Sequence, residues 1–240
     1  MPNAEPSGFI PTLNNMGYMT SRPDPVSQAF IEFAASQAPT PALDVGAAYG
    51  VASLTALERG ATIIANDIDP RHLEVLSARA MKSDRPRLSL RLGPFPQGFE
   101  DLEGSLSAIL VCRVIHFLKG QEVERWLKSA HNLLTPGGKI FVVTETPYLK
   151  NFCSIIPQFE DRKRQGDNWP GWIEDLRKID PRRGANLPAS IHFFDPDLLS
   201  RELSKAGFSI ESCTFLHRAD FPEDLRLDGR ESVGAIGVKR

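Results

Sequence analysis

The sequence has 240 residues, of which 41% are hydrophobic and 24% are charged, and its 28 basic and 30 acidic residues give a formal net charge of −2. This composition is typical of a folded globular protein that can bury a full core without disulfides or metals. The near-neutral balance argues against binding nucleic acid through bulk charge, and no apolar run approaches the ~20 residues of a membrane span.

The N-terminus has neither the basic start nor the apolar run of a secretory signal, so we expect a cytoplasmic protein. The three cysteines, Cys112, Cys153 and Cys213, lie far apart and form no CxxC pair. With so few histidines nearby, the spacing of a zinc site is missing. We expect reduced, buried thiols and no metal.

Strands and helices alternate along most of the chain. The first half predicts a helix over 26–38, a strand over 41–46, a helix over 51–60, a strand over 61–69, a helix over 69–83 and a strand over 87–93. The second half predicts a strand over 107–115, a helix over 119–138, a strand over 139–146, a helix over 195–208 and strands over 208–218 and 232–240. Such alternation predicts βαβ units and a parallel sheet.

Two segments depart from this alternation. Residues 147–194 are far longer than the ~2–6 residues of an ordinary connection, and long excursions of this kind often form lids. We predict one domain over residues 1–240, in which the N-terminal 1–40 and the insertion 147–194 form the lid. At least one aromatic or histidine side chain in or beside the insertion is expected to face the substrate, the candidates being Tyr148, Trp169, Trp172 and His192.

The sharpest motif is ALDVGAAYG at 42–50, where the first strand of the predicted sheet ends. Ligands of open α/β sheets bind beyond the carboxyl ends of the strands, and glycines there allow close approach of the backbone. Asp67 closes the next strand and could accept both hydroxyls of a ribose.

A dinucleotide site is the first candidate for this loop, but it requires G-x-G-x-x-G, and the second and third glycines are missing after Gly46. The loop also begins with Asp44, which would lie badly beside a diphosphate. An acidic loop instead suits a cationic ligand that has an amino acid moiety.

These motifs resemble the class I S-adenosylmethionine (SAM)-dependent methyltransferases. LDVGAAYG (43–50) looks like the family's D-x-G-x-G-x-G loop with Ala48 in place of the middle glycine, and ANDIDP (65–70) is similar to its second acidic motif. ILVCRVIHFL, NLLTPGGKIFVV and LLSRELSKAGF resemble later elements in the right order, so the resemblance spans about residues 40–240. It implies a Rossmann-like, seven-stranded, mostly parallel sheet with an antiparallel closing strand.

The resemblance also implies SAM as the cofactor. The residues that it assigns to cofactor binding are Tyr18, Thr20, Asp44, Gly46, Ala48, Gly50, Asp67, Ile68, Gly93, Cys112 and Arg113. The family often has an acid after the third strand that contacts adenine, whereas RLGPFPQGF (91–99) has none. Adenine recognition is therefore expected to use backbone groups or apolar contacts near Gly93 and Phe95.

Two side chains are the catalytic candidates. His116 follows the fourth strand, and with an ordinary pKa of ~6.5 it could act as a general base; the alternative is a histidine packed on the sheet edge. Tyr148 could stabilise a sulfonium through its ring, or it could belong to the core of a small helical lid. Arg113 could pair with an acidic substrate group or form a surface salt bridge.

The resemblance implies transfer of a methyl group to a small-molecule nucleophile, by an enzyme that binds neither nucleic acid nor membrane. Three rivals remain at this point: a nucleic-acid methyltransferase, a protein methyltransferase and a SAM-consuming cyclase that releases methylthioadenosine. A non-enzymatic binding module fits least well, because the cofactor motifs are largely intact. A nucleic-acid methyltransferase would show basic patches or an Asn/Asp-Pro-Pro-aromatic tetrapeptide, and the sequence has neither. A homodimer is one oligomeric state that the sequence allows.

Overall fold

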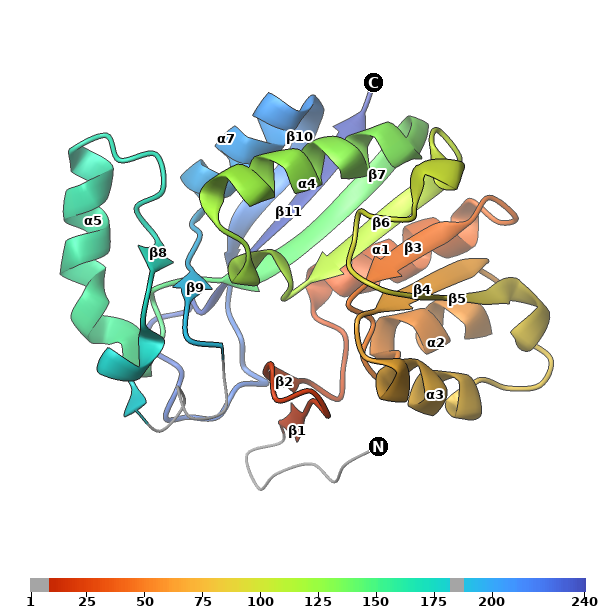
Figure 1. The fold of residues 1–240 in the computed structure, drawn as a ribbon, viewed down its shortest axis with the longest axis horizontal. Helices are drawn as coiled ribbons and strands as arrows, with labels where there is room; N and C mark the ends of the chain where they lie inside the picture. Colours follow the sequence, from red (N-terminus) through yellow and green to blue (C-terminus); the bar gives the residue numbers. More distant parts are fainter. Residues whose placement is uncertain (1–8, 182–187) are drawn as a thin grey trace.

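The computed structural model describes residues 9–181 and 188–240 (Figure 1). Its centre is a seven-stranded sheet in the order β10-β11-β7-β6-β3-β4-β5. The strands are β3 (Ala42–Val45), β4 (Ile63–Asp67), β5 (Leu88–Leu92), β6 (Leu106–Cys112), β7 (Leu134–Glu145), β10 (Phe208–Leu216) and β11 (Ser232–Lys239). Strand β11 pairs antiparallel with both of its neighbours, β10 and β7, and the other pairs in this sheet are parallel. The predicted seven-stranded, mostly parallel Rossmann-like sheet is confirmed.

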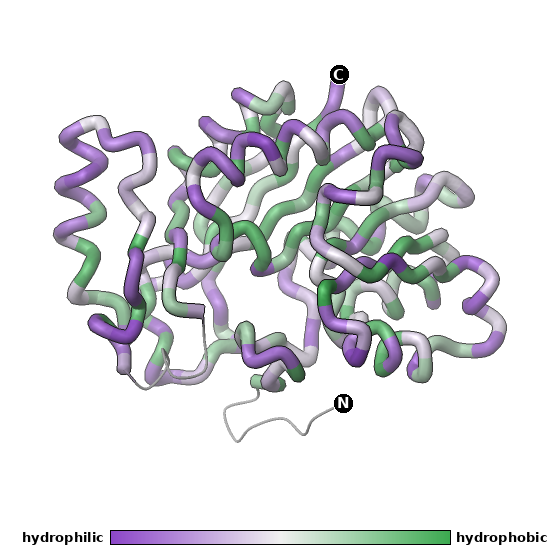
Figure 2. Tube along the Cα trace, in the orientation of Figure 1, coloured by the Kyte–Doolittle hydropathy of each residue, from purple (hydrophilic) through white to green (hydrophobic). Residues whose placement is uncertain are grey.

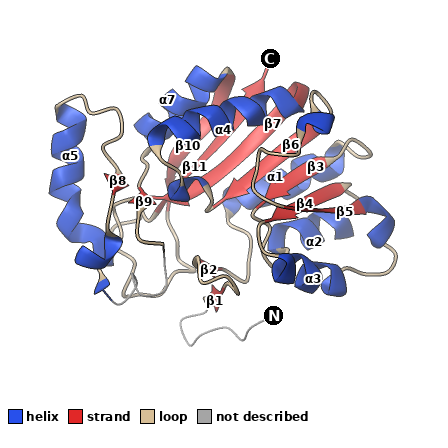
Figure 3. Cartoon of the chain, in the orientation of Figure 1, coloured by secondary structure: helices blue, strands red, loops and turns tan. Residues whose placement is uncertain are grey.

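Helices cover both faces of the sheet (Figure 3). They include α1 (Pro25–Ser36), α2 (Val51–Glu58), α3 (Pro70–Arg79), α4 (Gly120–Leu133) and α7 (Pro196–Ala206). Helix α5 (Ile156–Arg164) belongs to the insertion and stands apart from the sheet (Figure 1). Residues of α1 and α2 share one apolar core on one face, and residues of α4 and α7 share another. The strands are apolar on both sides because successive side chains point to opposite faces and both faces are covered, as the continuous green of the central strands shows (Figure 2).

Local chemistry sets the helix ends. The Asp69 side chain accepts a hydrogen bond from the Arg71 amide at the start of α3, where Pro70 occupies the first turn. At the end of α7, Gly207 takes the left-handed conformation with φ 106°. Both features are as the sequence predicts. The helix expected over 119–138 is too long, because β7 begins at Leu134, which pairs with Leu106 of β6.

The chain order of the strands positions the site. From β3 in the middle of the sheet the chain proceeds to β4 and β5 on one side, and then crosses back to β6 on the other side of β3. This reversal leaves a crevice at the carboxyl ends of β3 and β6, which is the position where open α/β sheets bind ligands.

Two small hairpins stand outside the main sheet. The N-terminal hairpin pairs β1 (Ile10–Pro11) with β2 (Tyr18–Met19), and β8 (Trp172–Ile173) pairs with β9 (Ile191–His192) in the insertion. A third apolar core joins them, and it comprises Phe9, Leu149, Phe152, Ile155, Leu176, Ile191, Phe193, Phe221 and Leu225, with Tyr18 packed against it. In Figure 1 the N-terminal hairpin lies between the insertion and the helices α2 and α3. The insertion therefore supports the outer side of this hairpin.

In the part of the chain that the structure describes, no helix combines the length and apolar character needed to cross a membrane.

Candidate active site

A cavity of about 310 Å³ lies at the carboxyl ends of β3, β4 and β6, and the N-terminal hairpin forms one of its walls. Of the residues assigned from the sequence, it brings together Tyr18, Thr20, Asp44, Gly46, Ala48, Asp67, Ile68, Cys112, Arg113 and His116. Gly50, Gly93 and Tyr148 are not among the described residues that line it.

The loop after β3 explains the glycine pattern of its sequence. Gly46, Ala48 and Gly50 all have positive φ, at 69°, 46° and 78°. A side chain at Gly46 would also place its Cβ 2.6 Å from the Val114 Cγ2 atom. A Cβ at Gly50 would meet Leu76 of α3 at the same distance, so Gly50 serves the packing of the loop and not the cavity wall. Ala48 adopts a conformation that glycine takes without strain.

Asp44 places a buried carboxylate at the floor of the cavity, with 4% of the residue exposed. Its Oδ2 atom accepts a hydrogen bond of 2.6 Å from the Ser53 hydroxyl. Burial raises the pKa of Asp44 from 3.8 to about 6; the Ser53 hydrogen bond opposes this rise and the nearby charge of Asp67 adds to it. At neutral pH, Asp44 is thus a costly buried anion that a cationic ligand would stabilise.

Asp67 is held by three protein donors. Its Oδ1 atom accepts a hydrogen bond from the Asp69 amide (2.9 Å) and lies 3.0 Å from the His72 Nδ1 atom. Its Oδ2 atom accepts a hydrogen bond from the Ala48 amide (2.9 Å). A carboxylate has about four acceptor positions, so about one on Oδ2 stays open for a ligand. The expectation that Asp67 accepts both hydroxyls of a ribose therefore exceeds its remaining capacity.

The segment after β5 borders the expected adenine side. The Gly93 amide donates to the Asp67 carbonyl at 3.0 Å, and the Asn66 side chain donates to the Gly93 carbonyl at 2.8 Å. Gly93 thus ties this segment to the end of β4. Pro94 and Phe95 line the cavity, as does Ile68, which is 51% exposed. Phe95, where apolar contacts with adenine are expected, is therefore one of the residues that line the cavity.

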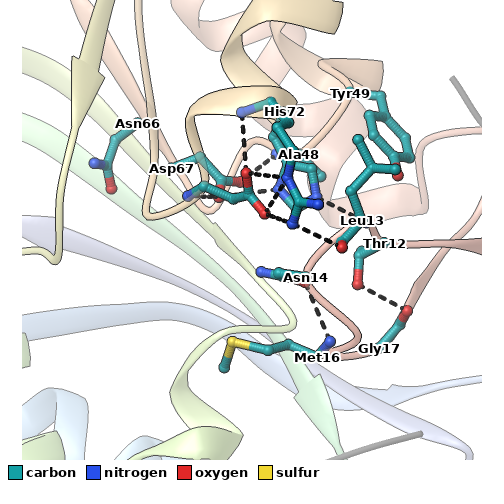
Figure 4. A network of polar contacts seen from close by, with 12 residues as sticks. Thr12, Leu13, Asn14, Met16, Gly17, Ala48, Tyr49, Asn66, Asp67 and His72 are labelled. Atoms are coloured by element: carbon teal, nitrogen blue, oxygen red, sulfur yellow. Dashed lines mark hydrogen bonds and ion pairs between the residues drawn. The ribbon is translucent and has the colours of Figure 1, made fainter.

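The N-terminal hairpin is tied to the loop after β3 and to α3 (Figure 4). The Tyr49 hydroxyl donates to the Pro11 carbonyl at 2.9 Å, and the Arg71 guanidinium donates to the Leu13 carbonyl at 2.8 Å. Beyond these anchors the chain turns back so that Tyr18 and Thr20 line the cavity.

Arg113 has a strained backbone with φ 60°, held by a hydrogen bond of 2.7 Å from its amide to the Val143 carbonyl. Its guanidinium lies 2.6 Å from Glu145 Oε1, outside hydrogen-bonding geometry, and 5.2 Å from the centre of the Phe221 ring. The Nη1 atom is buried and has no hydrogen-bond partner among the described residues. Arg113 therefore belongs to a largely buried ion pair that faces the cavity, and not to a surface salt bridge.

Several lining residues were missed from the sequence. Asp24 caps α1 through its side chain, and its Oδ2 atom lies 3.7 Å from the Cys112 Sγ atom, whose pKa burial raises to about 12. Arg218, only 2% exposed, forms a two-pronged ion pair with Asp220. Asp24 and Arg218 come from distant segments, and no sequence spacing links them to the loop after β3.

The cysteines are free, as expected. Their predicted burial is wrong for Cys153, which is exposed, while Cys112 and Cys213 are partly buried. Cys153 belongs to a short 3-10 helix of the insertion, where a pattern of local apolar residues does not decide which side faces the core.

His116 lines the cavity with only 5% of the residue exposed. Burial first, then the positive charge of Arg113 and the neighbouring His192, lower the pKa of His116 to about 3. The expectation of an ordinary pKa near 6.5 is wrong for this reason. At neutral pH the ring is uncharged, and it can accept or donate a hydrogen bond but holds a second proton poorly.

Tyr148 lies away from the cavity and has a structural environment. Its hydroxyl donates to Glu160 of α5, its ring meets the edge of Phe215 at 5.4 Å, and the Arg230 guanidinium lies 3.7 Å from the ring centre. No described residue of 147–194 lines the cavity. The aromatic residues of the insertion surround His192 instead, with the Trp169 and Trp172 rings 5.2 and 5.8 Å from its own.

Comparison with known proteins places this geometry in context. Residues 43–140 match the family model described as "Methyltransferase domain". No curated protein has a sequence that matches this chain. A SAM-dependent methyltransferase from Methanosarcina mazei superposes with a TM-score of 0.64 at 17% identity, covering 91% of this chain and 98% of that one.

Two further solved structures share the fold. The glycopeptide N-methyltransferase MtfA, complexed with S-adenosylhomocysteine, has a TM-score of 0.58 at 18% identity and 91% coverage of each chain. The 1,6-didemethyltoxoflavin-N1-methyltransferase of Burkholderia thailandensis has a TM-score of 0.59 at 15% identity, covering 90% of this chain and 79% of that one. Residues 43–140 thus match a methyltransferase domain, and the chain as a whole shares its fold with these solved SAM-dependent methyltransferases.

Proposed function

We propose that this protein binds SAM in the cavity at the carboxyl ends of β3, β4 and β6 and transfers its methyl group to a small-molecule nucleophile. The observation that carries the proposal is the cavity itself, in which the buried carboxylates of Asp44 and Asp67 lie beside a glycine loop and under the N-terminal hairpin. The cavity volume of about 310 Å³ lies within the range of sites for small ligands.

The lining residues fit the chemical groups of this cofactor. Asp44 supplies a desolvated negative charge for a cationic group, and the open acceptor position of Asp67 can take a hydroxyl. At the other side, the Arg113 guanidinium carries a positive charge that suits a carboxylate, and its Nη1 atom has no hydrogen-bond partner among the described residues. Ile68 and Phe95 offer apolar surface for a base.

When bound, SAM supplies a methyl group that its sulfonium already activates, so the protein needs mainly to position the acceptor and exclude water. The N-terminal hairpin excludes water from one side. His116 contributes a neutral imidazole that can accept a hydrogen bond from an N–H or O–H of the substrate that receives the methyl group. This bond would orient the lone pair of the substrate's nucleophilic atom. With a pKa of about 3, His116 cannot retain the proton, which must pass on to solvent.

Small-molecule transfer is tested with SAM that carries an isotopic label in its methyl group. The protein is incubated with labelled SAM and a cell extract that has been separated into low-molecular-weight and macromolecular fractions. We expect label in the small molecules together with S-adenosylhomocysteine. Label only in protein would indicate a protein methyltransferase, and labelled methylthioadenosine without S-adenosylhomocysteine would indicate the cyclase.

A further inference from the structure

A buried histidine that the cofactor motifs do not include connects Asp67 to the N-terminal hairpin. His72 lies in the first turn of α3 and is 1% exposed. Its Nδ1 atom is 3.0 Å from Asp67 Oδ1, and its Nε2 atom is 3.0 Å from the Leu13 amide nitrogen (Figure 4).

These two contacts fix the protonation of the ring. The Leu13 N–H is a donor, so Nε2 must present a lone pair; Nδ1 then carries the proton and donates to the carboxylate. The ring is neutral in this arrangement, because a doubly protonated imidazole would point an N–H at the Leu13 N–H. A continuous series of donors therefore runs from Leu13 through His72 to Asp67.

Each end of this series belongs to the cavity wall. Asp67 lines the cavity, and Leu13 lies between Thr12 and Asn14, which also line it. The Tyr49 ring stands edge-on to His72 at 5.2 Å and holds the imidazole in its plane. Hydrogen bonds that share one polarisable ring strengthen one another, so a change at either end is felt at the other.

We infer that His72 is a positioning residue that couples cofactor binding at Asp67 to the docking of the N-terminal hairpin. The inference rests on the proposed use of Asp67 as a cofactor ligand. A ligand on the open Oδ2 position favours the docked hairpin, and the docked hairpin favours the carboxylate orientation that binds the ligand, as reciprocity requires.

Two substitutions separate the two contacts of the ring. In His72→Asn the amide can replace the Nδ1 donor to Asp67 but reaches no further, so the Leu13 contact is lost. In His72→Gln the longer carbonyl can accept from Leu13, while Asp67 loses its donor. Tyr49→Phe serves as the matched control, because it removes the hairpin bond to Pro11 and leaves both contacts of His72 intact.

The readouts are the Kd of S-adenosylhomocysteine by calorimetry and hydrogen exchange of residues 10–20. For His72→Gln we expect an affinity about two- to tenfold weaker, the size of one hydrogen bond, with wild-type hairpin exchange in the free protein. For His72→Asn we expect faster hairpin exchange and a smaller gain in protection when ligand binds. Wild-type affinity and exchange in both variants would overturn the inference.

The wild-type protein provides a test that does not depend on the stability of variants. Long-range proton–nitrogen NMR spectra should show the Nδ1–H tautomer of His72 in the free protein, and its signals should move when S-adenosylhomocysteine is added. An Nε2–H tautomer would overturn the inference. If the expected tautomer is present but the wild-type protein binds no S-adenosylhomocysteine, the proposed function is wrong. In that case His72 does not couple cofactor binding to the hairpin either.

Discussion

Replacing Asp44 by Asn removes a buried negative charge from the cavity floor and keeps the size of the side chain. The folded-state pKa of about 6 lies above the ordinary value of 3.8, a difference that corresponds to roughly 3 kcal/mol. Because the folded pKa is raised, the stability associated with this group is fully present below pH 4 and is lost as the pH rises through 6. The ligand-free wild-type protein thus carries this cost at pH 7.5.

We therefore expect Asp44→Asn to raise the free energy of unfolding of the ligand-free protein by about 1–3 kcal/mol at pH 7.5, the lower figure allowing for the weakened Ser53 hydrogen bond. At pH 4 the two proteins should be nearly equal in stability. The affinity for SAM should change in the opposite direction and fall roughly 10- to 100-fold, the value of a hydrogen bond to a charged group.

Urea unfolding at both pH values and calorimetry with SAM measure these two effects. Ser53→Ala is the matched control, because it removes a donor to the same carboxylate and should destabilise the ligand-free protein at pH 7.5 by about 1–2 kcal/mol. If Asp44→Asn is less stable than wild type at pH 7.5 and binds SAM with unchanged affinity, Asp44 is not a destabilising buried anion that a cationic ligand stabilises.

Four further results are expected. Ala48→Gly should leave the free energy of unfolding unchanged or raise it by up to ~1 kcal/mol, because relief of the left-handed strain offsets the greater entropy of the unfolded chain; urea unfolding measures this, and clear destabilisation would contradict it. Asp67→Ala should weaken S-adenosylhomocysteine binding, measured by calorimetry, at least tenfold. It should also lower the free energy of unfolding by about 3 kcal/mol or more, because three protein donors lose their acceptor. An unchanged Kd would mean that Asp67 has only a local structural role. NMR titration should find the His116 ring uncharged down to pH 5, whereas a midpoint near 6.5 would show that burial does not lower its pKa. S-adenosylhomocysteine should slow hydrogen exchange in residues 10–20 and in residues 147–181, and equal exchange with and without ligand would exclude the lid that the insertion predicts.

Local patterns in the sequence suffice to predict the order of strands and helices and the position of the glycine loop after β3. Apolar runs in strands and capping residues of helices are local signals. Asp69 therefore caps the start of α3, and Gly207 caps the end of α7, as predicted. The loop motif is equally local, because its left-handed positions depend on the backbone of a few consecutive residues. Ala48 follows this geometry even though it lacks the glycine of the family pattern.

Pairing between distant strands decided what local pattern could not. The helix predicted over 119–138 ends at Leu133 because Leu134 pairs with Leu106, and Pro136 and the two glycines after it do not extend a helix. Tyr148 is a catalytic candidate because it lies beside the insertion and its ring could stabilise a sulfonium, but packing places it against α5 and away from the cavity.

Tertiary structure alone also assembled the polar groups around the ligand site. His72 and Leu13 are separated by 59 positions in sequence, and their hydrogen bond exists only because the N-terminal hairpin folds against α3. The pKa of His116 is likewise a property of the folded state, because desolvation and the charge of Arg113 act only once β6 and its neighbours are packed. Residue identity indicates which groups can titrate or bind, while burial and distant neighbours decide what those groups do.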